Sequence, residues 1–273
     1  MSEPTLRFDA TPPVATLELD HGKANEMGRA QLDEIDAITR RLSKDDEIRA
    51  LISFSRRRNA KGTPLFISGA NVTERQGWGR DTVAAHVRYQ RQVLGRLRQA
   101  PVFHVAVING VALGWGTEFL ITCDYRIAVR EATFGLPETG LGIVPGAGGS
   151  SELFALIGVP QALRLGMTGE RIDAAEALRI GLVQEVVDTV ELGLERAQEL
   201  AKQVARRSPT AVAAFKAACL GAVGRSALDR AELEARAYEL CLDSGEAAIG
   251  RENFAAILNG AEVPWGPRRS FRA

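Results

Sequence analysis

The sequence has no excess of charge of either sign and no long apolar run. Lys and Arg together number 34, as do Asp and Glu, so the formal net charge at pH 7 is +0. The balanced charge creates no net electrostatic attraction for nucleic acid or an anionic membrane. An anionic ligand must therefore be bound by a local group of residues. Because no stretch of about 18 uncharged apolar residues occurs, and residues 1–20 lack a signal-like pattern, we expect neither membrane spanning nor secretion.

Cysteine and histidine are also scarce. The cysteines Cys123, Cys219 and Cys241 are odd in number and widely spaced. This spacing predicts reduced, buried thiols rather than a disulfide framework or a zinc site. The three histidines share no ligand spacing with one another or with a cysteine, so we expect no metal site. The cytoplasm is the default compartment.

Strand and helix patterns alternate over the first two thirds of the chain. Strands are predicted at 14–19, 50–54, 102–108 and 126–129, with an apolar segment at 65–67. Helices are predicted at 30–42, 82–98, 116–123 and from about residue 150. Only helical patterns follow, at 192–206, 209–221, 226–242 and 246–259. The pattern predicts an α/β core over residues 1–191 and a helical region over residues 192–273.

Two glutamates lie in the densest glycine region, residues 109–151. Glu118 follows an apolar strand and a glycine turn, in the first turn of a predicted helix whose free N–H groups favour developing negative charge. Its simpler interpretation is an acid that complements the helix dipole. Glu138 lies in a loop with little other polarity, where burial would raise its pKa, unless it faces solvent. Together they form the pair of carboxylates that acid–base chemistry needs.

Other chemistries are poorly supported. There is no GxSxG motif, and Ser68 lacks the flanking glycine two residues earlier. The segment at 145–153 fits neither dinucleotide-binding nor P-loop spacing, and is better interpreted as a tight turn into a helix. Residues 56–64 form a basic loop with Arg56, Arg57, Arg58 and Lys61. It is either a solvated loop or a phosphate-binding one.

Three segments in order and spacing resemble the crotonase, or enoyl-CoA hydratase/isomerase, superfamily. They are FISGAN at 66–71, VINGVALGWGTEFLITCDYRIA at 107–128 and FGLPETGLGIVPGAGG at 134–149. A weaker match follows at 167–187. The resemblance implies an α/β fold, a spiral of repeated ββα units, with a helical C-terminal region that builds homotrimers, commonly paired into hexamers.

The resemblance also implies a site and a substrate. Backbone N–H groups of Ala70 and Trp115 would form an oxyanion hole, and Glu118 and Glu138 would be the catalytic pair of an enoyl-CoA hydratase. The implied partner is an acyl-CoA thioester, with no further cofactor and no metal. Coenzyme A or substrate would contact a set drawn from the same segments, namely Lys23, Ala24, Lys61, Ser68, Gly69, Ala70, Leu113, Gly114, Pro137 and Gly146.

The chain departs from the family pattern at three places. Trp115 replaces a usual glycine, so its indole either packs as core or forms part of the acyl-pocket wall. Asn71 replaces a usual aspartate, and FAAILNG at 254–260 replaces a common basic motif, which puts coenzyme contacts from a neighbouring subunit in doubt.

Retention of both glutamates favours hydration or the reverse dehydration. Within the superfamily the alternatives are isomerisation, decarboxylation and C–C bond hydrolysis. A non-catalytic binding protein of the same fold, or an RNA-binding one, would not need both glutamates and their glycines, and the net charge gives RNA binding no support.

Overall fold

The computed structural model describes residues 6–269 and 271 of the chain. Two sheets organise it. The larger sheet has the order β1-β2-β3-β5-β7-β10, and the smaller has the order β4-β6-β8-β9. The strands are β1 Arg7–Asp9, β2 Val14–Glu18, β3 Ala50–Phe54, β4 Leu65–Ile67, β5 Phe103–Ile108, β6 Val111–Leu113, β7 Tyr125–Val129, β8 Thr133–Gly135, β9 Ile172–Asp173 and β10 Glu185–Val187. Only the pairs β1–β2 and β8–β9 are antiparallel.

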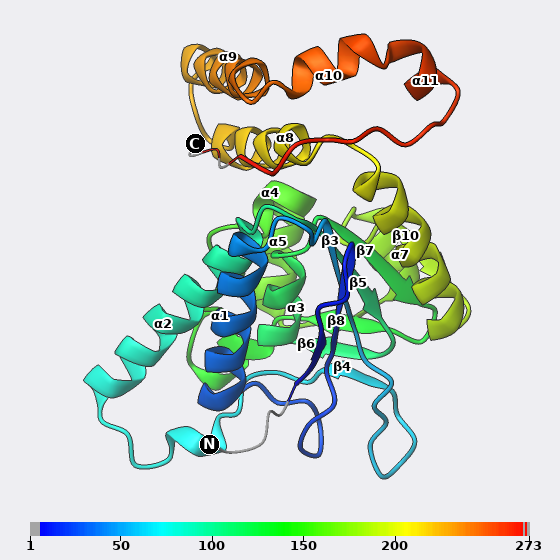
Figure 1. Cartoon of the computed structure of the whole chain (residues 1–273). Helices are drawn as coiled ribbons and strands as arrows, with labels where there is room; N and C mark the ends of the chain where they lie inside the picture. The colour runs from blue at the N-terminus through cyan, green and yellow to red at the C-terminus, as the bar shows by residue number, and fades with distance from the viewer. Residues whose placement is uncertain (1–5, 270, 272–273) are drawn as a thin grey trace.

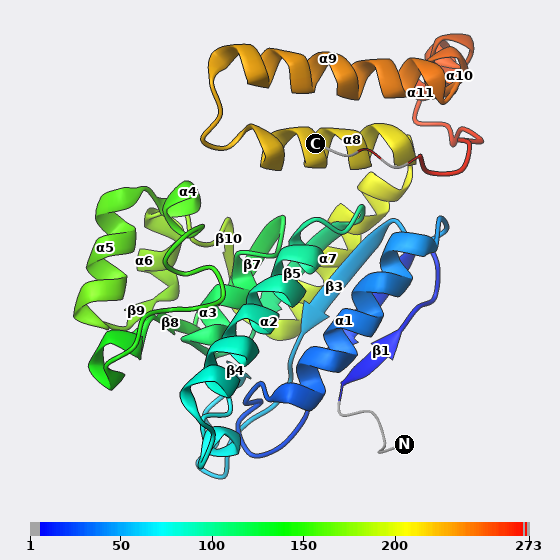
Figure 2. The ribbon, with the colours of Figure 1, turned by 90° about the vertical axis from the view of Figure 1, so that its left-hand side faces the viewer.

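The larger sheet is covered on both faces, which explains why its central strands are apolar throughout. Alternate residues of β3 belong to two different cores: Leu51 lies in the main core, and Ala50 and Ile52 lie in a second one. Figures 1 and 2 show the helices α1 Arg29–Lys44 and α2 Arg80–Arg98 on one face and α7 Val190–Ala205 on the other.

Three long strands, β3, β5 and β7, are each followed by a short strand that pairs in the smaller sheet. Thus β3 leads to β4 and α2, and β5 leads to β6 and α3 Trp115–Leu120. The strands β4, β6 and β8 are neighbours, so successive turns of the chain are stacked. The predicted spiral of ββα units is therefore confirmed. The 3-10 helices η1 Thr73–Arg75 and η2 Pro137–Leu141 lie in the connecting loops.

The remaining helices lie after β8 in the chain. They are α4 Phe154–Ile157, α5 Val159–Thr168, α6 Ala174–Arg179, α8 Pro209–Ala222, α9 Ala227–Asp243, α10 Glu246–Glu252 and α11 Phe254–Leu258. Most predicted boundaries lie within three residues of the observed ones, and two helices differ more clearly. The helix expected from about residue 150 begins at Phe154, and the helix expected at 246–259 is divided at Asn253, whose backbone is not helical.

The helices α8 and α9 form an antiparallel pair that stands apart from the sheets (Figures 1 and 2). By contrast, α7 packs so closely on the sheet that a Cβ at Gly193 would lie 2.7 Å from Val107 Cγ1. The predicted division at residue 191/192 stays a prediction.

No helix in the described ranges is both long and apolar enough to cross a bilayer.

The C-terminal segment returns to the core through Arg268. This buried guanidinium donates to the carbonyl oxygens of Leu42 at 2.9 Å, Asp45 at 3.0 Å and Ile48 at 3.0 Å. These carbonyls lie at and beyond the end of α1, where a helix lacks internal partners. A cation there stabilises the helix end.

The cysteine prediction is only partly right. All three thiols are free, and Cys123 is buried as expected. Cys219 is exposed, however, because it lies on the outer part of α8, which packs against α9 rather than inside a core. Cys241 is partly buried.

Candidate active site

The loop after β4 leaves one backbone N–H group unpaired. Met27 N–H donates to the Gly69 carbonyl at 3.0 Å, and Asn71 N–H donates to the Met27 carbonyl at 2.9 Å. In this parallel bridge the intervening residue, Ala70, faces away from Met27. Its N–H has no acceptor among the residues that the structure describes.

A second unpaired N–H group lies at the start of α3. The first hydrogen bond of this helix runs from Glu118 N–H to the Gly114 carbonyl at 3.0 Å. Trp115 is the first residue of the helix, so its N–H has no intrahelical partner. Within the described part of the chain nothing else accepts from it.

Glycines bring these two groups together. A Cβ at Gly116 would lie 2.2 Å from the carbonyl oxygen of Ile67, so only glycine lets α3 start against the end of β4. A Cβ at Gly69 would lie 3.6 Å from the Leu113 carbonyl oxygen. The loop that carries Ala70 therefore lies beside the turn that carries Trp115.

Glu118 is 3% exposed, and its side chain points toward a neighbouring loop rather than its own helix end. Its Oε1 accepts from Ala147 N–H at 2.7 Å and from Gly149 N–H at 2.9 Å. Burial raises the pKa of this carboxyl, while the two N–H groups act to lower it. The helix-dipole interpretation does not account for such a fixed and buried carboxylate.

Glu138 lies in η2 and is partly buried. Its Oε2 is buried and has no hydrogen-bond partner among the described residues. Burial, and then the charge of Glu118, raises the pKa of Glu138 to about 7. Its Oε1 would lie 2.6 Å from a Cβ at Gly114, whose φ of 53° also favours glycine. The solvent-facing interpretation of Glu138 is therefore unsupported.

These groups surround one short turn. Glu138 packs over Gly114, Trp115 offers its N–H, and Glu118 follows one helical turn later. One carboxyl accepts two hydrogen bonds, whereas the buried Oε2 of the other has no partner among the described residues. Such an arrangement can hold one carboxylate ionised and one protonated near neutral pH, next to donors that stabilise an oxyanion.

Most of the other residues predicted to contact coenzyme A or substrate lie around this turn. Lys23 and Lys61 lie instead on two separate loops. Ser68 Oγ donates to the Ala24 carbonyl at 2.7 Å, which joins those two segments. Gly146 packs against α2, because a Cβ there would lie 2.6 Å from Val87 Cγ1. Pro137 is the first residue of η2, immediately before Glu138. The structure thus brings together the predicted residues from 68–70, 113–114, 137 and 146.

Lys23 and Lys61 lie on two exposed loops that Arg57 joins. Arg57 donates to Asp20 at 2.7 Å and also to the Gly22 carbonyl. Both lysines are exposed, and neither has a carboxylate within 4.0 Å among the described residues. The arginines of this basic loop differ from the two lysines because they form ion pairs. Arg56 pairs with Glu18 and Glu191, and Arg58 pairs with Glu131.

Asn25 is a positioning residue that the sequence patterns did not reveal. It is fully buried with φ of 51°, and its Nδ2 donates to the Leu19 carbonyl, Ser55 Oγ and the Phe66 carbonyl at 2.9, 3.0 and 3.0 Å. It thereby fixes the loop that carries Lys23 and Ala24. The signal available was an Asn next to a glycine turn, a residue type that tolerates the left-handed conformation.

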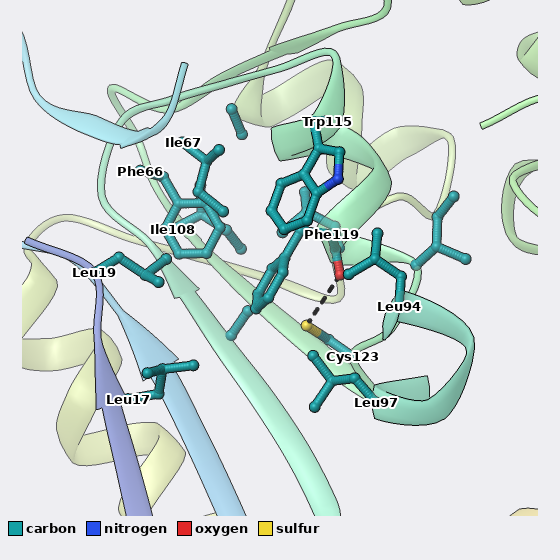
Figure 3. Packing of buried hydrophobic residues seen from close by; sticks show 14 of the residues in the cluster. Leu17, Leu19, Phe66, Ile67, Leu94, Leu97, Ile108, Trp115, Phe119 and Cys123 are labelled. Carbon is teal, nitrogen blue, oxygen red and sulfur yellow. Dashed lines mark hydrogen bonds between the residues drawn. The ribbon is translucent and has the colours of Figure 1, made fainter. Parts of the chain in front are cut away.

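The Trp115 indole packs as core. It is 2% exposed, and its ring centroid lies 5.9 Å from that of Phe119 (Figure 3). The flanking positions, Gly114 and Gly116, have no space for a side chain, whereas position 115 faces the main hydrophobic cluster. Of the two alternatives, core packing is the one that this geometry supports.

A Ser–His–Asp set outside the candidate site is structural. Ser53 Oγ lies 2.8 Å from His104 Nε2, yet Asp124 accepts from the backbone N–H of His104 rather than from its ring. Burial lowers the pKa of His104 to about 3, so the ring stays neutral. No metal-binding group of His, Cys, Asp and Glu occurs within the described residues.

Comparison with known proteins gives matches over most of the chain. A profile described as enoyl-CoA hydratase/isomerase matches residues 10–258. The short-chain-enoyl-CoA hydratase of Clostridium acetobutylicum is 36% identical over 206 residues, 75% of this chain and 77% of that protein. An enoyl-CoA hydratase structure from Bacillus anthracis has 34% identity and a TM-score of 0.86, covering 96% of this chain and 98% of that one. Pseudomonas aeruginosa DspI has 32% identity and a TM-score of 0.87, covering 97% and 98%.

The packing of Trp115 gives a test of stability. We expect Trp115→Gly to lower the free energy of unfolding by about 3–5 kcal/mol, because it removes a large buried side chain. Trp265→Gly is the control, since Trp265 is only partly buried, and it should cost clearly less. Urea unfolding measures both. A cost for Trp115→Gly no greater than that of the control would show that the indole is not a core residue.

Proposed function

The chain belongs to the enoyl-CoA hydratase/isomerase family, and from that premise we propose that it adds water across the α,β double bond of an enoyl-CoA thioester, or removes water in the reverse direction. The observation that carries this proposal is the pair of carboxyl groups around one turn, one bonded to two N–H groups and the other unpaired with a pKa of about 7.

The oxyanion hole is the first part of the proposed mechanism. Water addition to the β carbon places negative charge on the thioester oxygen as the enolate forms. The N–H groups of Ala70 and Trp115, which have no partner among the described residues, would donate to that oxygen. Preorganised donors of this kind contribute several kcal/mol to stabilisation of the transition state.

The two glutamates would divide the proton transfers. Glu118 is held by the N–H groups of Ala147 and Gly149, which favour its ionised form against the burial that raises its pKa, and it would orient a water molecule and remove its proton as the oxygen attacks the β carbon. Glu138, protonated near neutral pH, would deliver a proton to the α carbon. Glu118 then loses the proton it took up to solvent and Glu138 takes one up, which restores both groups, so the sum is addition of one water. We propose that no cofactor or metal is needed beyond the coenzyme A of the substrate.

Isomerisation is the nearest alternative within the family. It moves a proton between two carbons and needs one working carboxylate, whereas this site presents two. Decarboxylation and C–C hydrolysis usually depart from the two-glutamate pattern. A non-catalytic protein would have no need of a buried, unpaired Glu138 carboxyl, which costs free energy of folding.

We also propose a homotrimer or a homohexamer. The helices α8 and α9 expose large apolar side chains, Phe215 at 71%, Leu228 at 81% and Tyr238 at 68%, and Phe215 and Tyr238 line a groove between the two helices. Exposed apolar groups on one helical pair favour a protein interface.

The first kinetic prediction concerns the glutamates. Glu118→Gln and Glu138→Gln should each lower kcat for crotonyl-CoA hydration by about 10²–10⁴-fold, because each removes one positioned acid or base. The exposed Glu195→Gln on α7 is the matched control and should keep wild-type turnover. Loss of the enone thioester absorbance measures the rate, and product mass distinguishes hydration from isomerisation. Near-normal turnover by either site variant would contradict the two-carboxylate mechanism.

The second kinetic prediction concerns Lys23 and Lys61. We propose that Lys23 and Lys61 contact the phosphates of coenzyme A, so each Lys→Ala variant should raise KM for crotonyl-CoA about two- to fivefold, as expected for an exposed ion pair. The pantetheine thioester lacks the nucleotide phosphates and should be unaffected. Lys202→Ala, an exposed lysine on α7, is the control. Equal changes in KM for both esters would rule out phosphate contact. Arg57 is unsuitable as a probe, because it also joins the two loops.

A further inference from the structure

The buried face of α2 changes character along its length. Its buried residues are His86, Gln90, Val93, Leu94 and Leu97. The spacing of 86, 90 and 94 places these residues on one face, one turn apart. The second half of this face is apolar and packs in the main core, whereas the first half is polar. A polar half-face costs free energy unless its groups have partners.

The buried polar groups on this half of the face lack hydrogen-bond partners among the described residues. Gln90, 3% exposed, has no partner for Nε2, and His86, 4% exposed, has none for either ring nitrogen. Glu74 Oε1 is 3.6 Å from His86 Nε2, beyond hydrogen-bond distance. Arg75 has a buried, unpaired Nε–H and forms no ion pair with the residues described here.

Most of these unpaired atoms are donors. The Arg75 Nε–H and the Gln90 Nε2 amino group donate only, and neutral imidazole offers one N–H. Burial, and then the charge of Arg75, lowers the pKa of His86, which favours that neutral ring. The nearby acid Asp33 is bonded to Arg29 at 3.0 Å and to Tyr89 at 2.6 Å, so it is not the missing partner. One acceptor, Glu74 Oε1, is also buried without a hydrogen-bond partner, so the donors of the cluster outnumber the acceptors available to them among the described residues.

This polar cluster, Arg75, His86 and Gln90, lies beside the candidate active site. Arg75 ends η1, which follows the Ala70 loop directly. On α2, Arg91 donates to the Gly146 carbonyl at 3.1 and 3.0 Å, and Val87 touches the same glycine. Gly146 begins the segment whose N–H groups hold Glu118. The cluster is thus connected both to the loop of the proposed oxyanion hole and to the segment that fixes Glu118, the proposed catalytic base.

We propose that the polar cluster binds an oxygen acceptor on the acyl chain, so that the preferred substrates are acyl-CoA thioesters with a carbonyl or carboxylate group beyond the reacting carbons. This inference rests on the proposed function, because it assigns the acyl group of the same site. A purely hydrocarbon acyl chain would leave the three side chains desolvated and unpaired, which disfavours its binding.

The test compares acyl groups of equal length. Pentanoyl-CoA, 4-oxopentanoyl-CoA and glutaryl-CoA differ only at the far end, and heptanoyl-CoA, 6-oxoheptanoyl-CoA and pimeloyl-CoA repeat the comparison for a longer chain. Isothermal titration calorimetry of the wild-type protein should give a Kd about 10- to 100-fold lower for an oxygenated ester than for its hydrocarbon partner in at least one series. The keto and carboxylate arms distinguish a neutral acceptor from an anionic one.

Variants locate the effect. Arg75→Met and Gln90→Leu should each reduce the preference for the oxygenated ester about tenfold or more, while leaving the Kd of the hydrocarbon ester within about twofold. Arg80→Met is the matched control, because Arg80 is exposed and pairs only with the adjacent Asp81. Should one variant fail to fold, the other still decides the matter.

The two proposals fail separately. If the wild-type protein hydrates crotonyl-CoA but binds hydrocarbon and oxygenated esters equally, or if the variants weaken both equally, the inference about the acyl group is overturned and hydration stands. If the preference is present and depends on Arg75 and Gln90 but crotonyl-CoA and its oxygenated analogues are not hydrated, the acyl inference stands and hydration is overturned.

Discussion

The candidate site depends on the contact between the start of α3 and the end of β4. Gly116 lies against the carbonyl oxygen of Ile67, where a Cβ would be only 2.2 Å away. Because the helix begins there, its first N–H is beside the loop that carries Ala70. The same contact turns residue 115 toward the main core, so a tryptophan is accommodated where the family usually has glycine. A backbone donor does not depend on its side chain, provided that the helix start keeps its geometry.

The electrostatics follow from this packing. Glu118 is desolvated but has two N–H donors, whereas the Glu138 carboxyl is partly buried and has an oxygen without a partner. The charge of Glu118 also opposes ionisation of Glu138, so the two titrate as a coupled pair. The difference between their environments, rather than the presence of two acids, is what permits opposite roles near neutral pH.

Much of this was predictable from sequence, and the limits have physical causes. The long strands and helices were predicted because hydrophobic periodicity is strong over five or more residues, whereas β6, β8 and β9 have two or three residues and left no periodic signal. The glycine motifs predicted the turn around Glu118, but the Ala147 and Gly149 donors come from a segment about 30 residues later, which only the fold brings near. The unpaired groups of Arg75, His86 and Gln90 were invisible, since sequence does not show which polar residues lack partners.

The central claim is that Glu138 is protonated near neutral pH because it is desolvated beside the ionised Glu118. Carboxyl ¹³C NMR titration of protein labelled at glutamate tests it most directly. The account predicts a signal that titrates near pH 7, is absent from Glu138→Gln, and moves to lower pH in Glu118→Gln, where the neighbouring charge is removed. If no glutamate signal titrates near pH 7, or if such a signal persists in Glu138→Gln, the account is contradicted.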